Sequence, residues 1–291
     1  MRAFFKIMNS NRYFYKTDSF DLYNTFYNGQ CFRWEKIAEG AFEGIAGNKP
    51  LRLYQVRNGV ELECIESDFA FWSTYFDLAT DYSAIEDQYK KDPALLDCVN
   101  VGSGMHILRQ DLWEVIISFI ISQNNNIARI KKIILNLSCK YGKEISAYGN
   151  TYYSFPTPHE LACATESELK DIGLGYRADY IVKCTEHINK HPEFIPLLCK
   201  MDYASAREAL LSVKGIGPKV ANCILLFGLR KFEAFPVDTW INKAMKYLYP
   251  ECGNSKNDIE AYAKNRFGEY AGIAQQYIFY AARQGAIKLE D

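Results

Sequence analysis

The sequence predicts an α+β protein in which an N-terminal antiparallel β-sheet domain precedes a mostly α-helical region. Short aromatic and β-branched runs separated by turn dipeptides fill residues 17 to about 85, which is typical of antiparallel strands. From His106 onward, apolar residues recur at helical spacing instead. The chain has 291 residues, 48% of them hydrophobic, so it can bury a sizeable core. We therefore expect a sheet domain over residues 1–100 and a helical region over residues 101–291.

The expected strands lie in the first part of the chain. Dipeptides such as Asn28-Gly29 and Asn58-Gly59 separate the apolar runs and favour tight hairpin turns. Aromatic and β-branched residues between such turns fit a pleated sheet. Strands are predicted at residues 20–26, 31–34, 41–45, 51–56 and 60–64.

The expected helices follow from apolar faces that repeat with helical periodicity. Leu108, Leu112, Val115 and Phe119 share such a face in the first of them. Further helices are predicted at residues 126–141, 177–189, 203–213, 218–229, 239–248, 257–266 and 270–284. The apolar run at residues 115–121 is too short to span a bilayer, so we expect no membrane partner.

Composition argues against several classes of protein. The nine cysteines are scattered without a C-x-x-C pair, so neither a zinc site nor an iron–sulfur cluster is expected. Their odd number, and a start that does not resemble a secretory signal or targeting segment, favour reduced thiols in a prokaryotic cytoplasm. The net charge of −1 does not by itself indicate a nucleic-acid partner, but residues 204–246 hold seven Lys or Arg against three Asp or Glu.

A glycine-rich turn between two predicted helices, at about residues 204–229, is the first candidate functional segment. Gly215 and Gly217 allow a tight hairpin there, and Pro218 opens the next helix. Free backbone N–H groups at such a helix start suit a phosphate. The alternative is an ordinary connection between two helices, and the G-x-G pattern alone does not exclude it.

Lys219 and Asp238 are the candidate chemical groups. Lys219 lies in the first turn of its helix, where the positive helix end and partial burial both disfavour a charged amine, and an uncharged amine is a nucleophile. A surface lysine that contacts phosphate is the alternative. Asp238 is placed to cap the next predicted helix, and it could also stabilise positive charge or move a proton.

Five segments, in matching order over roughly residues 20–285, resemble one family. The hairpin, Lys219 and the downstream Pro-Val-Asp resemble the helix-hairpin-helix–GPD superfamily of DNA glycosylases. The other segments narrow the resemblance to 8-oxoguanine DNA glycosylases with AP-lyase activity. They are Asn28 to Trp34, similar to S-G-Q-x-F-R-W; Ser122 to Ile130, similar to S-x-N-N-N-I-x-R-I; Leu174 to Ala178, similar to L-G-Y-R-A; and Tyr270 to Gln275, similar to Y-A-G-x-A-Q.

The resemblance implies an enzyme of base excision repair. In this family the lysine that matches Lys219 attacks C1′ of the damaged nucleotide and forms a Schiff base, and β-elimination then cuts the strand. Asp238 matches the family's catalytic aspartate. No cofactor is expected to be required, and a monovalent or divalent cation at the hairpin, residues 213–218, is compatible with the resemblance. The implied partner is double-stranded DNA containing 8-oxoguanine, bound by a monomer at the nucleoid.

The resemblance also assigns residues that read the extruded base. The carbonyl of Gly29 would accept from N7–H, which 8-oxoguanine has and guanine lacks, so guanine would leave that carbonyl unpaired. Gln275 would read the Watson–Crick edge, while Cys223 and Phe279 would enclose the ring. Simple core packing remains the alternative for Cys223 and Phe279, and a hairpin turn for Gly29.

Other residues are implied to hold the DNA. Asn124 would fill the space left by the extruded nucleotide. The opposite cytosine would be held by Arg129, Tyr176 and Arg177, and the backbone at Gly215 and Gly217 would contact phosphate. A helix-surface charge is the alternative for Arg129.

Trp240 departs from the family pattern, because relatives commonly carry a phosphate-contacting His two residues after the catalytic aspartate. Alkylation-type relatives also carry Trp there, but they lack the lysine. A glycosylase for alkylated bases is therefore the nearest alternative function, and it leaves Lys219 and the Gly29 turn unexplained. A cluster-bearing thymine-glycol or adenine glycosylase would need four clustered cysteines. A non-catalytic DNA clamp would use the hairpin without Lys219 and Asp238.

Overall fold

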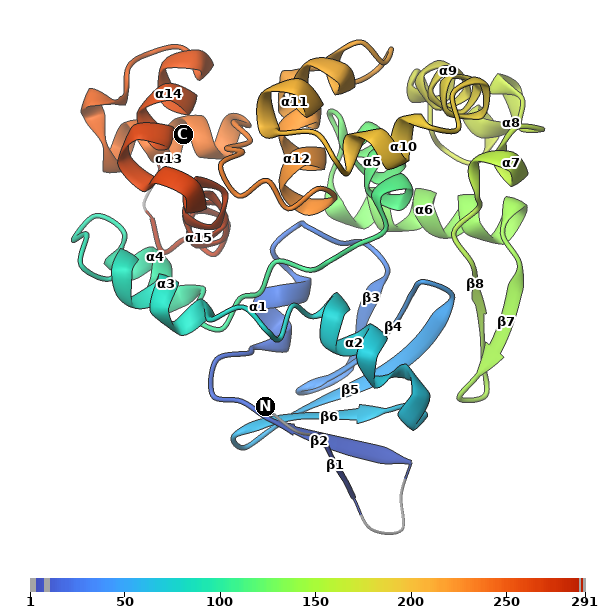
Figure 1. The fold of residues 1–291 in the computed structure, drawn as a ribbon, viewed down its shortest axis with the longest axis horizontal. Helices are drawn as coiled ribbons and strands as arrows, with labels where there is room; N and C mark the ends of the chain where they lie inside the picture. The colour runs from blue at the N-terminus through green and yellow to red at the C-terminus, as the bar shows by residue number, and fades with distance from the viewer. Residues whose placement is uncertain (1–3, 8–10, 288, 290–291) are drawn as a thin grey trace.

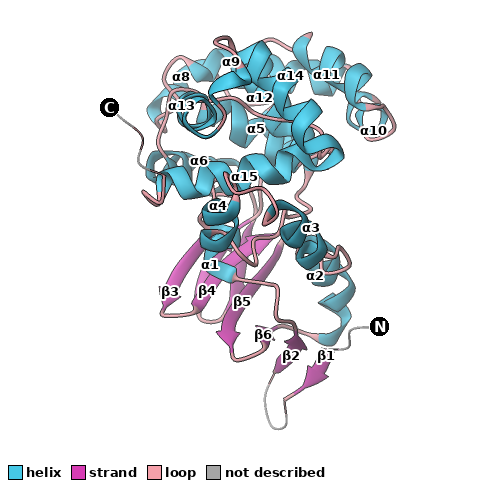
Figure 2. Cartoon of the chain, turned by 90° about the vertical axis from the view of Figure 1, so that its left-hand side faces the viewer, coloured by secondary structure: helices cyan, strands magenta, loops and turns pink. Residues whose placement is uncertain are grey.

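The sheet and most of the helices lie at opposite ends of the molecule. The computed structural model describes residues 4–7, 11–287 and 289, and it has a six-stranded antiparallel sheet below a body of helices (Figures 1 and 2). The order in the sheet is β1-β2-β6-β5-β4-β3, so β3 to β6 form a meander and β2 adds to it by pairing with β6. The strands are β1 (Phe4–Lys6), β2 (Arg12–Lys16), β3 (Trp34–Ala38), β4 (Ala41–Ala46), β5 (Lys49–Val56) and β6 (Gly59–Glu63).

Helices begin inside the sheet domain and dominate the rest of the chain. The α-helices are α1 (Leu22–Phe26), α2 (Phe69–Tyr75), α3 (Tyr82–Tyr89), α4 (Leu96–Val101), α5 (Leu112–Ser122), α6 (Ile127–Tyr141), α7 (Pro158–Leu161), α8 (Glu166–Asp171), α9 (Arg177–Lys190), α10 (Phe194–Leu198), α11 (Tyr203–Leu211), α12 (Pro218–Phe227), α13 (Thr239–Leu248), α14 (Lys256–Phe267) and α15 (Ala271–Arg283). Short 3-10 helices are η1 (Glu66–Asp68), η2 (Pro250–Cys252) and η3 (Gly268–Tyr270). Among the described residues, no helix is long and apolar enough to cross a bilayer.

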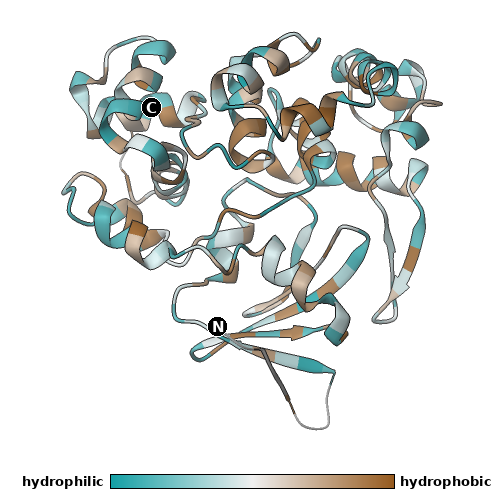
Figure 3. Cartoon of the chain, viewed as in Figure 1, coloured by the Kyte–Doolittle hydropathy of each residue, from teal (hydrophilic) through white to brown (hydrophobic). Residues whose placement is uncertain are grey.

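Each end of the molecule has its own apolar core. In the sheet core, the rings of Phe26 and Trp34 stack with their centroids 4.4 Å apart, and the Trp34 indole donates to the Tyr75 hydroxyl at 2.9 Å. The helical core surrounds α5 and α12, whose side chains are nearly all buried and which are largely brown in Figure 3. Side chains of α3 and α4 join this second core, and the division of the chain near residue 100 stays a proposal.

The predicted strand at residues 20–26 was wrong, because this segment contains helix α1. Asp21 caps that helix by accepting from the backbone N–H of Asn24 at 2.7 Å. The cap and the burial of Phe26 against the sheet outweigh the β-propensity of the aromatic residues. The strand predicted at residues 31–34 was also misplaced, since only Trp34 belongs to β3.

Most of the other predicted strands and helices are present in the structure. Strands at 41–45, 51–56 and 60–64 are confirmed as β4 to β6, and the seven later helices as α6, α9 and α11 to α15 with small shifts at their ends. Strands β1 and β2 and helices α2 to α4, α7, α8 and α10 were missed. A β-hairpin, β7 (Glu144–Ala147) paired with β8 (Asn150–Tyr153), interrupts the helical region and was also missed. It extends to the sheet domain, where Arg52 donates to the carbonyl of Tyr148 at 3.3 Å.

Asp77 joins the sheet domain to the helical region. Its fully buried carboxylate accepts from Arg109 at 2.8 Å and from Arg230, which follows α12, at 2.6 Å. The Tyr82 hydroxyl donates to the same carboxylate at 2.8 Å. Burial alone would raise the pKa of Asp77, but Arg230 and the hydrogen bonds from neighbouring side chains lower it below its ordinary value. One charged group therefore ties α12 to the end of the sheet core.

Candidate active site

The residues predicted to act on the base meet at one cavity between the sheet end and the helices. Its volume is about 40 Å³, enough for a few water molecules and too small for a purine. The lining comes from the loop after α1, from α5, α12 and α15, and from the segment before α13. The lining residues are Asn28, Gly29, Phe119, Lys219, Cys223, Phe227, Pro236, Asp238, Gln275, Gln276 and Phe279. All six residues assigned to catalysis or base reading are among them.

The hairpin before α12 places Lys219 at this cavity. Helix α11 ends at Leu211, and Gly215 turns the chain with a left-handed φ of +93°. A Cβ at Gly215 would lie 2.6 Å from the Cβ of Tyr180, so only glycine fits. Pro218 then opens α12, and Lys219 falls in the first turn, as the sequence predicts. The Lys219 amine lies 5.6 Å from the centre of the Phe119 ring, within the range of a cation–π contact.

Cys223 lies one turn further along α12, on the same face as Lys219. Burial raises the pKa of its thiol, and the neighbouring Lys219 ammonium lowers it in part. The net shift is upward, so Cys223 is a neutral thiol at physiological pH and presents a soft apolar surface to the cavity. This setting suits contact with a ring better than nucleophilic chemistry.

Asp238 has the capping role that the sequence predicts. Its carboxylate accepts from the backbone N–H of Ile241 at 2.8 Å at the start of α13. The side chain is half-buried and also lines the cavity with Lys219. Capping and chemistry are therefore compatible at this residue, since a carboxylate has further lone pairs to offer.

The loop that carries Gly29 is held by its neighbour Gln30. The buried Gln30 amide donates to the carbonyls of Thr25 and His106 at 2.9 and 2.7 Å and accepts from the N–H of Leu108 at 2.8 Å. Gly29 itself has a φ of +83°. Gln30 lies within the family-like segment from Asn28 to Trp34, but it was assigned no role from the sequence.

Phe279 closes the cavity over Gly29. A Cβ on Gly29 would lie 3.3 Å from Cε1 of Phe279, so the ring packs directly on this turn. A purine is many times larger than a water molecule, and it can enter only if lining side chains move. Phe279 is half-buried and is one of the side chains that line the cavity over this turn.

Gln275 lies in the cavity with its orientation fixed. Its Nε2 donates to the carbonyl of Pro236 at 3.1 Å. Its Oε1 accepts from Nε2 of Gln276 at 2.7 Å, and both glutamines are 3% exposed. Gln276 was not predicted as a site residue; its position beside Gln275 was the available signal.

Asn124 stands at the tip of the loop between α5 and α6. It is exposed and has a left-handed φ of +47°, which asparagine tolerates better than most residues. The next turn of chain begins α6, capped by Asn126 through the N–H of Arg129 at 2.9 Å. The preceding residue, Gln123, donates to the carbonyl of Gly215 at 2.9 Å and so ties this loop to the hairpin.

The three residues predicted to hold the opposite cytosine surround this loop. Arg177 is buried and donates to the carbonyls of Gln123 at 2.7 Å and Asn124 at 2.8 Å, so it supports the loop from below. Tyr176 is exposed, and its hydroxyl donates to the carbonyl of Gln123. Arg129 is exposed and donates to the carbonyl of Gly173 at 3.2 Å. The structure brings these residues together, and their contact with cytosine stays a prediction.

Gly217 and Trp240 lie at the starts of α12 and α13. Gly217 has an extended φ of −90°, open space where a Cβ would be, and no side-chain cap, so the first-turn amides of α12 are open to a phosphate. Trp240 is 47% exposed and is not part of the cavity lining. Across the described part of the chain, no three His, Cys, Asp or Glu side chains gather as metal ligands.

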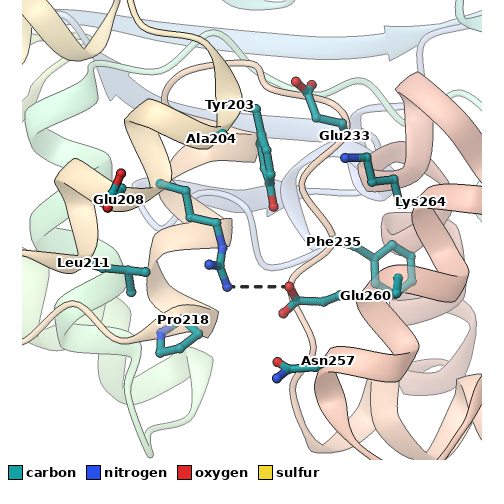
Figure 4. A pocket seen from close by; sticks show the side chains of 12 residues that line it. Tyr203, Ala204, Glu208, Leu211, Pro218, Glu233, Phe235, Asn257, Glu260 and Lys264 are labelled. Atoms are coloured by element: carbon teal, nitrogen blue, oxygen red, sulfur yellow. Dashed lines mark ion pairs between the residues drawn. The ribbon is translucent and has the colours of Figure 1, made fainter.

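A larger cavity, of about 820 Å³, lies beside the hairpin between α11, α12 and α14 (Figure 4). Arg207 of α11 faces Glu260 of α14 there, with 3.7 Å between Nη2 and Oε2. None of the residues predicted to act on DNA lines this cavity. It is therefore separate from the candidate active site.

The chain resembles known proteins along nearly its whole length. The family model "8-oxoguanine DNA glycosylase, N-terminal domain" matches residues 12–116, and the model "HhH-GPD superfamily base excision DNA repair protein" matches residues 117–269. An N-glycosylase/DNA lyase of Arabidopsis thaliana is 34% identical over 88% of this chain and 76% of its own length. A probable N-glycosylase/DNA lyase of Methanothermobacter thermautotrophicus is 35% identical over 73% of this chain and 74% of its own.

A solved structure is also similar to this chain over its whole length. It is the 8-oxoguanine glycosylase/lyase of Clostridium acetobutylicum in complex with double-stranded DNA containing cytosine opposite 8-oxoguanine. The two chains are 38% identical and superpose with a TM-score of 0.93, covering 99% of each. This chain belongs to the HhH-GPD superfamily of base excision DNA repair proteins, in the group whose N-terminal domain is that of 8-oxoguanine DNA glycosylases.

Proposed function

We propose that this chain is a bifunctional DNA glycosylase and AP lyase that excises 8-oxoguanine from duplex DNA. The observation that carries the proposal is the meeting of Lys219 and Asp238 with Gly29, Cys223, Gln275 and Phe279 at one cavity. The relatives' names, N-glycosylase/DNA lyase, support the same activity. The DNA in the Clostridium acetobutylicum complex supports the same substrate.

The proposed reaction uses Lys219 as the nucleophile. Its nitrogen bonds to C1′ as the bond from C1′ to N9 breaks, and the base leaves with that electron pair and takes up a proton. Asp238 stabilises the positive charge that develops on the sugar. Ring opening gives an imine between Lys219 and C1′, and loss of the 2′ proton then expels the 3′ phosphate. An amine nucleophile therefore explains both base removal and strand cleavage.

Lesion recognition is proposed to rest on one proton. The N7–H of 8-oxoguanine donates to the carbonyl of Gly29, whereas the bare N7 of guanine would face that oxygen with a lone pair. Gln275 reads the Watson–Crick edge, and Cys223 and Phe279 enclose the ring. The left-handed turn at Gly29 and its anchor Gln30 support this assignment, because they fix the direction of the carbonyl.

The DNA is proposed to bind across the hairpin and the α5–α6 loop. Asn124 fills the space of the extruded nucleotide, and Arg129, Tyr176 and Arg177 hold the opposite cytosine. The backbone N–H groups of Gly215 and Gly217 contact phosphate. The hydrogen bond between Gln123 and Gly215 supports joint action of these two segments.

A cation at residues 213–218 is part of the proposal. The carbonyls of Val213 and Gly215 each accept one hydrogen bond, from Ile216 at 3.1 Å and Gln123 at 2.9 Å, and each keeps a second lone pair for a cation. Replacing a potassium salt by the choline salt of the same anion, at the same concentration, should weaken duplex binding. The anion and the ionic strength are then unchanged, so the loss reports the cation. Equal affinity in the two salts would contradict the cation. We further propose that the enzyme acts as a monomer on nucleoid DNA in the cytoplasm.

Covalent trapping tests the activity. Borohydride should link the protein to a duplex with 8-oxoguanine opposite cytosine, because it reduces the imine to a stable amine. Lys219→Gln should abolish this product while duplex binding persists. Lys264→Gln removes an exposed lysine at the second cavity and is the matched control, expected to trap normally. Trapping that survives in Lys219→Gln would overturn the assignment.

A lesion panel separates the proposal from its nearest alternative. Excision of 8-oxoguanine in preference to 3-methyladenine is expected, because only the former offers N7–H to Gly29. The reverse preference would instead indicate a glycosylase for alkylated bases.

A further inference from the structure

Two buried polar atoms at the active-site cavity have no hydrogen-bond partner. They are Nδ2 of Asn28 and Oε1 of Gln276. Asn28 is 1% exposed and Gln276 3% exposed, and both side chains line the cavity. Buried polar groups are normally paired, so an unpaired donor and an unpaired acceptor beside one cavity require an explanation.

The orientation of Gln276 follows from a chain of hydrogen bonds. The carbonyl of Pro236 can only accept, so Gln275 must turn its NH₂ toward it, at 3.1 Å. Gln275 Oε1 therefore points the other way and accepts from the NH₂ of Gln276 at 2.7 Å. That hydrogen bond leaves Oε1 of Gln276 unpaired. Two acceptor oxygens thus belong to side chains that line the cavity.

The orientation of Asn28 is fixed in the same way. Its Oδ1 accepts from the backbone N–H of Gln30 at 3.1 Å, and a backbone N–H can only donate. The NH₂ of Asn28 is left as a donor at the cavity, next in the chain to Gly29. Gln30 is itself held by three hydrogen bonds, so the direction of the Asn28 amide is firmly determined.

The chemistry of 8-oxoguanine complements this arrangement. Its Watson–Crick edge carries two adjacent donors, N1–H and the 2-amino group, which match two acceptor oxygens. Its N7–H is flanked by the carbonyls O6 and O8, so a base that donates N7–H to the carbonyl of Gly29 brings an acceptor close to the neighbouring residue. The unpaired groups of the cavity are therefore the complements of groups on this base.

We propose that Gln276 and Asn28 are two further specificity-determining residues. Gln276 holds the acceptor of Gln275 in place and supplies a second acceptor for the 2-amino group, and Asn28 donates to a carbonyl that flanks N7. This inference rests on the function proposed above, and it adds residues that the family motifs did not assign. Closing the cavity without a base leaves both groups unpaired, and the correct base satisfies both.

The test measures duplex affinity in the Lys219→Gln background, which cannot turn over. Gln276→Met removes the polar atoms at similar length, and Asn28→Asp keeps the oxygen that accepts from Gln30 but loses the NH₂. Each should lower affinity for an 8-oxoguanine duplex roughly fivefold, as the loss of one neutral hydrogen bond predicts. Affinity for a duplex with a tetrahydrofuran site, which brings no base into the cavity, should not change. Equal losses on both duplexes would show a structural role and overturn the proposal.

A base lacking one donor gives the second readout. The parent Lys219→Gln protein should bind 8-oxoguanine roughly fivefold better than 8-oxohypoxanthine, which has no 2-amino group, and Gln276→Met should erase that difference. A difference that persists in Gln276→Met would overturn the role of Gln276. If the parent protein binds guanine and 8-oxoguanine duplexes equally, the proposed function itself fails, which separates the two outcomes.

Discussion

Replacing Asp77 by Asn should destabilise the protein by breaking the charged contact between its two ends. Asp77 has a left-handed φ of +53°, which Asn adopts readily, so the backbone is preserved. The carboxylate is fully buried and pairs with Arg230, which is 17% exposed, and with Arg109, which is 42% exposed. Removing one partner of a buried ion pair costs about 3–5 kcal/mol. Because solvent screens the Arg109 contact, we expect about 3 kcal/mol, most of it from Arg230.

Urea denaturation of the DNA-free protein, followed by far-UV circular dichroism, measures this effect. The free energy of unfolding should fall while its slope against urea stays constant. Arg230→Gln should cost a similar amount, and the double variant should cost clearly less than the sum of the two. A loss below about 1 kcal/mol in Asp77→Asn, or full additivity, would refute the reasoning.

The stability that Asp77 contributes should depend on pH. The pKa of Asp77 is lower in the folded state than in the unfolded chain, where it is about 3.9. The folded state therefore binds this proton less readily, and the carboxylate contributes its full stability above the unfolded pKa. That contribution is lost as the pH falls through the lower, folded pKa. The difference between the parent protein and Asp77→Asn should be constant near neutral pH and shrink below about pH 4.

Three further changes give distinct outcomes. Gly215→Ala should lower the free energy of unfolding by about 1–2 kcal/mol and weaken binding of any duplex, because its Cβ meets Tyr180 and its φ is left-handed. Gly217→Ala is the control and should be neutral. Equal stabilities and equal anisotropy titrations of the two variants would contradict this. Arg177→Met should lower the free energy of unfolding by about 1–3 kcal/mol and reduce the preference for cytosine over adenine opposite the lesion. The reason is that the carbonyls of Gln123 and Asn124 lose the hydrogen bonds from Arg177. Unchanged urea curves and excision rates would oppose it. Gly29→Ala should abolish 8-oxoguanine excision yet retain cleavage at abasic sites, which bring no base; parallel loss of both activities would exclude a role in base reading.

The longer helices with apolar periodicity and the chemical groups at their starts were the predictable part of the molecule. Helices α11 and α12 and the turn between them follow from apolar periodicity, two glycines and Pro218, which are all local signals. Lys219 and Asp238 were identified for the same reason, since each occupies a defined position at a helix start. Their meeting at one cavity depends on packing between α12, α13 and α15, and only the family resemblance anticipated it.

The segments that were missed depend on distant partners. Residues 20–26 carry strand-forming aromatics, but their conformation is decided by the cap at Asp21 and by burial on the sheet. The hairpin of β7 and β8 is held by contacts to Arg52 and Glu63, far away in sequence. Gln276 follows Gln275 in the sequence, but its unpaired oxygen is visible only in the folded structure. Local sequence reports caps and periodicity, whereas these features are tertiary.

The small volume of the active-site cavity bears on how a base is selected. Under the proposed function, every extruded base, damaged or not, must first meet a conformation in which lining side chains have moved. Each apparent affinity is then reduced by the fraction of molecules that are open. This reduction is the same for guanine and 8-oxoguanine, and it leaves their ratio unchanged. The reduction in affinity does, however, keep the very abundant guanine far from saturating the site. The proposed hydrogen bond from N7–H of 8-oxoguanine restores the occupancy for the lesion. On this proposal, the need to open the cavity sets a threshold, and only a fully complementary base is held long enough to react.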